Sequence, residues 1–279
     1  MYAVGDPNAA IVGEPRMAGR SPKNLLRGGL ADWIQAADPD AVVVSISGKD
    51  RAAIALAGKT RGQVYWIAPG IARFVTSTYY RSEYPDWVTR FNQTVMPALW
   101  ADTTWEQAVP ARWRGLSRGD TSAYEGDGLH TAFPHVASQE LRRRSAAAFD
   151  LWAYHQPRQD RAVLLLAEEA IAQLRLGQRG ALDFLAISLS ATDYIGHDYG
   201  PLGREQLDNL YRLDHELEAL FDRLDATVGA GEWVVGLSAD HGVMTVPEAL
   251  EAMGRSAQRL DYRVRSRAIP SAAQDAAGE

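Results

Sequence analysis

A buried strand, a long amphipathic helix and a second buried strand follow one another between residues 182 and 238. Residues 182–190 (LDFLAISLS) and 233–238 (WVVGLS) are short runs of apolar β-formers, and residues 204–228 between them place leucines on one helical face. A strand, a crossover helix and a further strand are typical of parallel pairing in one sheet. The pattern predicts an α/β fold with a central sheet flanked by helices.

The N-terminal part of the chain continues the same alternation. Ser21 and Pro22 are typical of a helix start, and a run rich in valine follows after Asp-Pro-Asp. A turn at Pro69-Gly70 separates two further apolar runs. The elements expected from these signals are helices at 21–34, 50–57 and 164–176 and strands at 41–47, 64–67 and 73–77.

Residues 79–157 differ from the rest, because they hold five of the eight tryptophans and show weak periodicity. Such a stretch is typical of an inserted cap packed by large aromatic side chains. We therefore expect two parts of one α/β core on either side of this cap, followed by a polar tail. The predicted divisions are 1–78, 79–157, 158–256 and 257–279.

Charge and composition exclude several classes of protein. With 29 basic and 35 acidic residues the net charge is −6, and no basic stripe of the kind that binds nucleic acid is present. No apolar run is long enough to cross a membrane, and the first residues do not form a signal peptide. Because the chain has no cysteine, a metal site must use His, Asp and Glu.

Three polar clusters come directly after predicted strands, at residues 47–51, 190–200 and 238–242. The carboxyl ends of the strands are where open α/β sheets bind their ligands. In the second cluster Asp193 and His197 are four residues apart, and in the third Asp240 and His241 are adjacent. Carboxylate and imidazole suit zinc when no thiolate is available, so two such pairs predict two metal ions.

Each of these features also has a simpler interpretation. An Asp and a His four residues apart are often a surface ion pair, and Asp-His-Gly at a strand end is often a turn. Two pairs at neighbouring strand ends favour a site over either alternative. The other four histidines are interpreted as structural; they are His130, His135, His155 and His215.

Lys49 and Arg51 lie in the first cluster. A lysine and an arginine near a helix start can be a solvated face. At the carboxyl edge of the sheet, however, the two cations would meet the oxygens of a phosphoryl group. Together with two metal ions, they point to phosphate-ester chemistry.

These motifs resemble those of the alkaline phosphatase superfamily, and within it the PafA-type alkaline phosphatases, which are related to type I phosphodiesterases and nucleotide pyrophosphatases. Residues 193–201 (DYIGHDYGP) and 239–242 (ADHG) resemble the two metal motifs, and residues 47–51 (SGKDR) resemble the phosphate-contacting segment of the PafA branch. Further similar segments are 20–26, 77–80, 133–135 and 212–214.

The resemblance implies a two-zinc phosphomonoesterase in which a threonine attacks phosphorus and a zinc-bound hydroxide releases the product. Asp193 and His197 would ligate one zinc, and Asp240 and His241 the other. Lys49 and Arg51 would contact phosphoryl oxygens, which favours monoesters over diesters. Small phosphate monoesters are the expected partners, with neither nucleic acid nor membrane. Family members are typically exported; neither the oligomeric state nor the location of this chain follows from its sequence.

The family's nucleophilic threonine, a further Asp ligand, a phosphate-contacting Asn and a third histidine ligand have no counterpart in this sequence. Thr192, Thr121 and Thr76 are poor substitutes, because a nucleophile must reach metal and substrate together. We therefore expect an incomplete alkaline-phosphatase-like sheet, a central fragment with little or no turnover, and incomplete zinc sites. The alternatives are a non-catalytic module that binds metal or phosphate, and a phosphodiesterase or nucleotide pyrophosphatase of the same superfamily.

Overall fold

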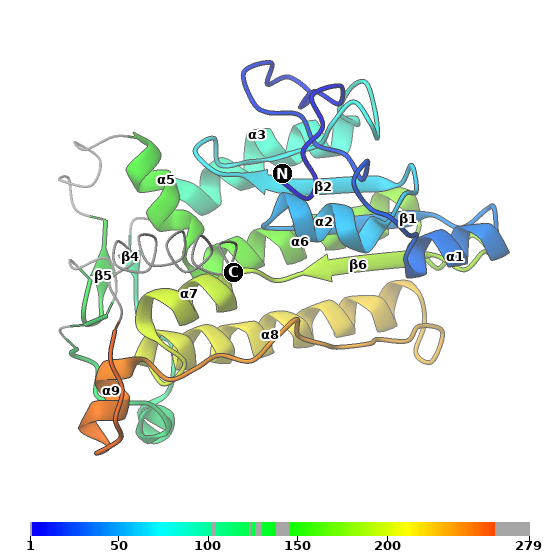
Figure 1. The fold of residues 1–279 in the computed structure, drawn as a ribbon. Helices are drawn as coiled ribbons and strands as arrows, with labels where there is room; N and C mark the ends of the chain where they lie inside the picture. Colours follow the sequence, from blue (N-terminus) through cyan, green and yellow to red (C-terminus); the bar gives the residue numbers. More distant parts are fainter. Residues whose placement is uncertain (1, 102–103, 123, 126–129, 138–145, 260–279) are drawn as a thin grey trace, which may run out of the picture.

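A four-stranded mixed sheet forms the centre of the computed structural model, which describes residues 2–101, 104–122, 124–125, 130–137 and 146–259 (Figure 1). Across the sheet the order is β3-β2-β1-β6. The middle strand β1 is parallel to both neighbours, whereas β3 runs antiparallel to β2. The strands are β1 (Val43–Ser47), β2 (Gln63–Ala68), β3 (Arg73–Val75) and β6 (Phe184–Ser188).

Helices cover both faces of the sheet, which confirms the predicted α/β fold. Val44 and Ile46 of β1 face one way and join the larger core cluster with α3, α6 and α8, while Val64 and Trp66 of β2 face α2 and the N-terminal segment. The helices are α1 (Leu30–Ala37), α2 (Asp50–Ala57), α3 (Asp86–Ala101), α5 (Ala146–Tyr154), α6 (Pro157–Leu174), α7 (Ala191–Tyr199), α8 (Arg204–Thr227) and α9 (Pro247–Ala252).

Most of the predicted elements of the core are confirmed. The helix predicted at 50–57 is α2, the strand at 41–47 contains β1, and the apolar runs around Pro69-Gly70 are β2 and β3. The parallel crossover of this sheet is β1-α2-β2. Because β1, β2 and β6 are parallel, their carboxyl ends lie at the same edge.

The predicted helix at 21–34 is wrong in its first half, since α1 begins only at Leu30. Ser21 does not cap a helix there; its hydroxyl donates to the carboxylate of Asp6 at 2.6 Å and accepts the N–H of Lys23 at 3.1 Å. The first turn of α1 is closed instead by Asp32, whose carboxylate accepts the N–H of Gly29 at 2.7 Å. Ser-Pro here stabilises a turn, not a helix start.

The third predicted strand, at 233–238, is also wrong. The segment is irregular, and the side chains of Val234 and Leu237 are 96% and 85% exposed. A strand requires a hydrogen-bonded neighbour, and no strand among the described residues pairs with this segment. It runs back beside α8, where Trp233 stacks on Phe221 with ring centroids 5.4 Å apart (Figure 1).

Residues 79–157 combine a core helix with a smaller aromatic layer. Trp87 and Trp100 of α3 belong to the larger core cluster. A two-stranded sheet of β4 (Thr104–Trp105) and β5 (His135–Val136) and a 3₁₀ helix, η1 (Ala111–Leu116), follow. The division of the chain into a core and a cap stays a prediction. Most of the predicted tail, residues 260–279, lies outside the described residues.

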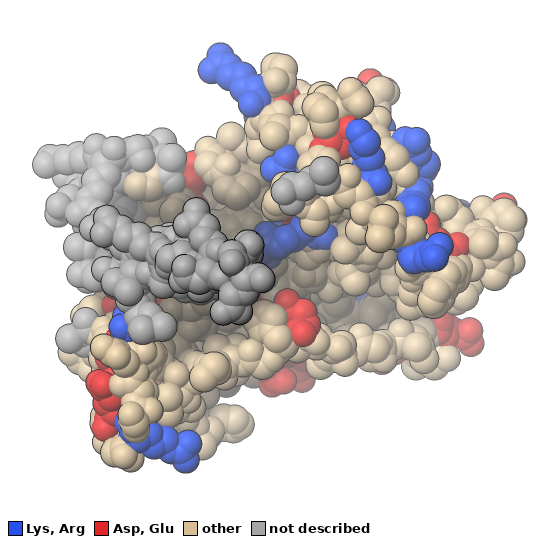
Figure 2. All heavy atoms as spheres, viewed as in Figure 1, with Lys and Arg blue, Asp and Glu red and all other residues tan. Residues whose placement is uncertain are grey.

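The described part of the chain contains no helix with the length and apolarity needed to cross a membrane. On the face drawn in Figure 2, Lys and Arg side chains gather over the N-terminal part of the molecule and beside a hollow below it, while acidic side chains are scattered.

Candidate phosphate and metal site

Lys49 and Arg51 lie where the sequence placed them, at the carboxyl end of β1. Lys49 is the residue before α2, and its backbone N–H donates to the Ser47 hydroxyl at 3.0 Å. Both cations line a cavity of about 220 Å³ together with Tyr154 and Tyr194. The cavity therefore joins the first and second polar clusters of the sequence.

The Lys49 side chain links these two clusters directly. Its ammonium forms an ion pair with the carboxylate of Asp193 on α7 and lies 4.4 Å from the centroid of the Tyr194 ring. Only 11% of the lysine side chain is exposed. The ion pair, in which the Asp193 side chain is 30% exposed, holds the β1-α2 loop against the first turn of α7.

Arg51 interacts with Tyr2, which belongs to a hydrogen-bonded group centred on Asp50. Tyr2 donates its hydroxyl hydrogen to Asp50 at 2.5 Å, and Arg20 donates to the second oxygen of Asp50 at 2.5 Å. Burial lowers the pKa of Arg51, but hydrogen bonding and charge interaction with Tyr2, together with Tyr194 and Asp50, outweigh it and raise the pKa. Arg51, which is exposed at the wall of the cavity, therefore keeps its charge.

Asp193 and His197 form the predicted pair on α7, with 3.3 Å between Asp193 Oδ1 and His197 Nε2. Burial raises the pKa of Asp193, yet the hydrogen bond and charge of Lys49, followed by the charges of His197 and His241, bring it below its ordinary value. The carboxylate is therefore ionised and can bind a cation. The influence of His241 means that the third cluster lies within electrostatic reach of the second.

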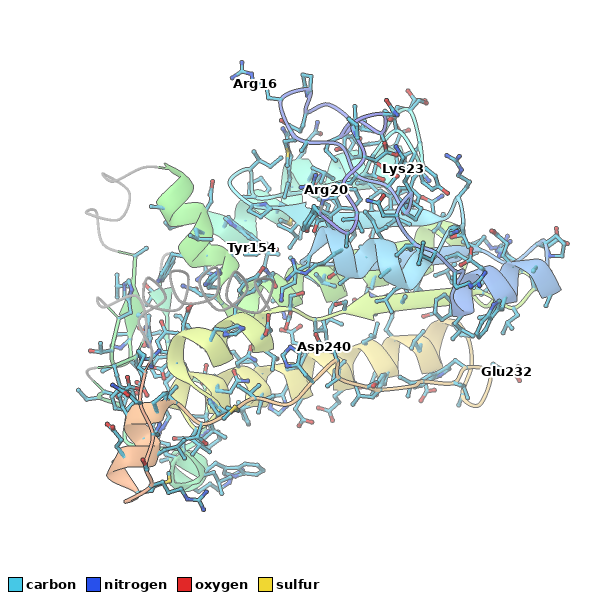
Figure 3. All side chains as sticks on the ribbon, viewed as in Figure 1. Arg16, Arg20, Lys23, Tyr154, Glu232 and Asp240 are labelled. Carbon is cyan, nitrogen blue, oxygen red and sulfur yellow. The ribbon has the colours of Figure 1, made fainter. Side chains whose placement is uncertain are left out.

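Asp240 and His241 lie on the irregular segment that crosses α7 and α8 (Figure 3). A side-chain oxygen of Asp240 is 3.5 Å from His241 Nε2, and the two side chains are 89% and 58% exposed. Two residues later Val243 approaches Gly196 of α7, where an added Cβ would lie 3.9 Å from its methyl group. The segment therefore lies on α7, but Asp240 points into solvent.

The spacing within each pair suits a zinc ion. Two donor atoms at about 2.0–2.2 Å from a tetrahedral zinc lie roughly 3.3–3.5 Å apart. The Asp193–His197 and Asp240–His241 distances of 3.3 and 3.5 Å match that separation. Within the described ranges, however, no three His, Asp or Glu side chains are grouped so that they could hold one ion. Each pair offers two corners of a coordination sphere and leaves the others to further ligands.

Two contacts that could not be predicted from the sequence hold the segments that carry Lys49 and Asp193 in place. Asp160 of α6 is buried, and its Oδ1 accepts the N–H of Ala191 in the first turn of α7 at 3.0 Å. Burial raises its pKa to about 7 against hydrogen bonds from the backbone of residues 190–192 and the charge of Lys49. Tyr154 donates its hydroxyl hydrogen to the Gly48 carbonyl. Neither contact has a signal in the sequence, because both join distant segments.

His155, interpreted as structural, lies beside α7. Its Nδ1 is 2.8 Å from Asp198 Oδ2, and its ring stacks on Tyr194 with centroids 4.3 Å apart. His135 is fully buried against Glu205 at 2.9 Å, as expected of a core histidine. The Tyr194 ring is thus held between His155 and Lys49, and it was signalled only by its place in the motif of residues 193–201.

Comparison with known proteins identifies the family and several relatives of this chain. Residues 16–273 match the family described as type I phosphodiesterase / nucleotide pyrophosphatase. The chain is 36% identical over 252 residues to the alkaline phosphatase PhoV of Synechococcus elongatus, covering 88% of this chain and 45% of PhoV. It is 33% identical over 245 residues to the alkaline phosphatase PafA of Elizabethkingia meningoseptica, covering 87% of this chain and 45% of PafA.

A crystal structure of PafA superposes on 92% of this chain and 50% of its own, with a TM-score of 0.83 and 30% identity. The chain thus spans about half the length of the curated relatives that it matches. The family match over most of the chain and the shared fold lead to one conclusion: this chain belongs to the type I phosphodiesterase / nucleotide pyrophosphatase family, within the alkaline phosphatase superfamily.

Proposed function

We propose that this chain forms the phosphate-binding and metal-binding part of a zinc-dependent phosphomonoester hydrolase. The observation that carries the proposal is the contact between Lys49 and Asp193, because it joins the phosphate-contacting segment to the first metal motif at the carboxyl edge of the sheet. The relatives named PhoV and PafA are alkaline phosphatases, which supports the reaction class.

In this proposal Asp193 and His197 hold one zinc, and Asp240 and His241 hold the other. Bound zinc would supply positive charge to the transferred phosphoryl group and acidify a bound water. Lys49 would leave Asp193 for a phosphoryl oxygen, since the carboxylate would then face the metal. Arg51, whose charge is retained in the cavity, would take a second oxygen.

The two cations also favour a monoester. A phosphate monoester offers three non-bridging oxygens, whereas a diester has replaced one of them with a second substituent. A cavity of about 220 Å³ with Lys49 and Arg51 in its wall has room for a phosphoryl group at that position. A phosphodiesterase or nucleotide pyrophosphatase would need the same volume for the second substituent.

A second candidate is a module that binds metal or phosphate without turnover. The observation that favours it is the solvent exposure of Asp240 and His241. Exposed side chains of this kind are not held in a fixed position by their neighbours. In this case zinc and phosphate bind, but monoester hydrolysis by the isolated chain does not exceed that of zinc alone. We expect negligible hydrolysis of p-nitrophenyl phosphate by this chain under either candidate; zinc-dependent turnover would mean that it contains its own nucleophile.

The test is zinc binding measured by isothermal titration calorimetry. The double variant Asp193→Asn/His197→Ala should lower the zinc affinity about tenfold or more, because a carboxylate and an imidazole are lost together. A matched control is Asp214→Asn/His215→Ala, an exposed Asp-His pair on α8. Equal zinc binding by the wild type and the Asp193/His197 variant would remove the proposed metal site.

A further inference from the structure

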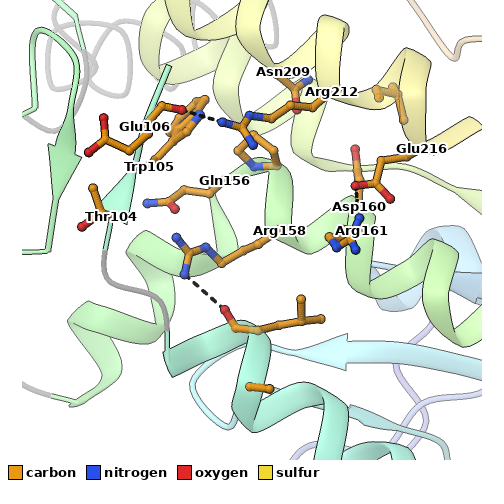
Figure 4. A pocket seen from close by; sticks show the side chains of 14 residues that line it. Thr104, Trp105, Glu106, Gln156, Arg158, Asp160, Arg161, Asn209, Arg212 and Glu216 are labelled. Atoms are coloured by element: carbon orange, nitrogen blue, oxygen red, sulfur yellow. Dashed lines mark hydrogen bonds and ion pairs between the residues drawn. The ribbon is translucent and has the colours of Figure 1, made fainter. Parts of the chain in front are cut away.

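A second cavity in the described part of the chain has no role in the site above. It encloses about 430 Å³ and lies between the end of α3, β4, the first turns of α6 and the middle of α8 (Figure 4). None of the residues expected to bind phosphate or metal lines it. A cavity of this volume admits a small ring compound.

Gln156 is the group in this cavity that most needs a ligand. It precedes the first turn of α6 and is 98% buried, with only 2% of its surface exposed. Neither its amide nitrogen nor its amide oxygen has a hydrogen-bond partner among the described residues. A buried amide without partners costs about 1–3 kcal/mol, so an arrangement of this kind is stabilised when a bound molecule supplies the missing bonds.

Asp160, one turn further along α6, presents a second unfilled acceptor. Its Oδ1 is used by the N–H of Ala191, but its Oδ2 has no partner among the described residues, and Asp160 lines the same cavity. The cavity thus offers a donor and an acceptor from Gln156 and a further acceptor from Asp160. Both side chains are more than nine-tenths buried.

The three arginines of the wall already have partners. Arg161 is paired with Glu216, and Arg212 bonds to Asp208 at 2.7 Å. Arg158 donates to the Leu99 carbonyl at 3.2 Å, and Figure 4 shows its guanidinium extending toward the same side of the cavity as the Gln156 amide. Two of the three arginines in the wall are thus paired with carboxylates and are not free to bind an anionic ligand.

We infer that this cavity binds a small uncharged ring with a lactam or cyclic imide edge, of the kind found in pyrimidinediones. The ring C=O and N–H would pair with the Gln156 amide in two parallel hydrogen bonds, as amide side chains pair with nucleobase edges. A further ring N–H would donate to Asp160 Oδ2. The planar guanidinium of Arg158 provides a face for the ring, and Leu99 and Leu213 provide apolar contact.

The inference is independent of metal and phosphate binding, and uracil is the probe that tests it. In ¹H-¹⁵N spectra of the full chain, uracil should cause saturable shifts of the Trp105 indole N–H and the Asn209 side-chain amide, both in the cavity wall. The matched compound 1,3-dimethyluracil has no N–H and should bind about tenfold more weakly or not at all, since each lost hydrogen bond costs about 1 kcal/mol or more.

The variant Gln156→Leu should weaken uracil binding about tenfold as well. Gln173→Leu is the control, because Gln173 lies on the same helix but is exposed and bonds to Glu169. Absence of saturable uracil shifts, equal binding of the two compounds, or unchanged binding in a folded Gln156→Leu variant would each overturn the inference. If that variant does not fold, the inference is tested by comparing the binding of uracil and 1,3-dimethyluracil to the wild-type chain.

Discussion

The ammonium of Lys49 lies against the carboxylate of Asp193, 144 positions later in the chain. The contact joins the loop after β1 to the first turns of α7, and both loops leave adjacent parallel strands. It also places a cation where the carboxylate would otherwise face a metal ion. Zinc would compete with Lys49 for the Asp193 carboxylate, whereas phosphate would bind to the lysine itself.

Lys49→Met should affect these two ligands in opposite directions. Zinc affinity should rise about tenfold, because a positive charge next to Asp193 is removed, and phosphate affinity should fall about tenfold for the same reason. Calorimetry with zinc alone and with inorganic phosphate in the presence of zinc measures both. Lys59→Met, an exposed lysine beyond the far end of α2, is the control. A loss of both affinities would show that Lys49 acts only by holding the fold.

Asp160→Asn should change the pH dependence of stability. The folded pKa of Asp160 is about 7 and its ordinary value is 3.8, so between these values the folded state binds more protons than the unfolded state. The wild-type free energy of unfolding should therefore fall as pH rises from about 4 to 7, by about 1.4 kcal/mol for each unit of the shift that is realised. Asparagine keeps an oxygen for the Ala191 N–H but does not titrate, so the variant should not show this fall in the free energy of unfolding.

Urea unfolding of the wild type and Asp160→Asn at several pH values measures the difference between the two free energies. The variant should gain stability relative to the wild type as pH rises through that window. Parallel pH curves for the two proteins would mean that Asp160 has an ordinary pKa in the folded chain.

Tyr154→Phe should reduce stability and phosphate binding together. Without the hydroxyl, the Gly48 carbonyl loses its buried donor, at a cost of about 1–3 kcal/mol, and the loop that presents Lys49 loosens. Tyr84→Phe is a matched control, because the Tyr84 hydroxyl also donates to a backbone carbonyl, that of Val12, far from the cavity. If both variants lower phosphate affinity equally, Tyr154 has no special effect on the site.

The exposed apolar side chains of Val234 and Leu237 lead us to expect self-association of the chain. Leu237→Lys and Val234→Lys should reduce it, and they should change the free energy of unfolding by no more than about 0.5 kcal/mol because both side chains are already exposed. Sedimentation velocity at increasing protein concentration measures the association. Leu26→Lys tests whether any exposed leucine has the same effect, since Leu26 is 89% exposed but lies in the N-terminal segment. If all three substitutions reduced self-association equally, the added positive charge would be the cause, and not the position of the apolar side chain.

The sequence predicted most local elements of the core and the two segments that carry Lys49 and Asp193. The helix predicted at 50–57 has the same bounds in the structure, and Lys49 and Asp193 were expected at one edge because parallel strands end together. The strand predicted at 233–238 was wrong for a different reason. Apolar β-formers indicate that a segment can form a strand, but they do not show that another strand lies beside it.

The contacts of Asp160, Tyr154 and Gln156 could not be predicted, because each depends on segments that only the fold brings together. Asp160 looks like an ordinary polar position of a helix, although it supports the first turn of α7. Gln156 looks like a solvent-facing residue before a proline, yet it is almost fully buried. Burial of a polar side chain inside a cavity has no periodicity that a sequence could display.

The pairing of β1 with β6 has a consequence for how the molecule assembles. Val42 donates to Asp183 across a separation of 141 residues, at the start of the ladder between the two strands. Contacts this distant in the chain form late and slowly, since a long loop must close before they are made. On the ribosome, the loop of Lys49 is complete long before Asp193 has been synthesised, so the contact between the two can form only after the strand β6 and the start of α7 have been made.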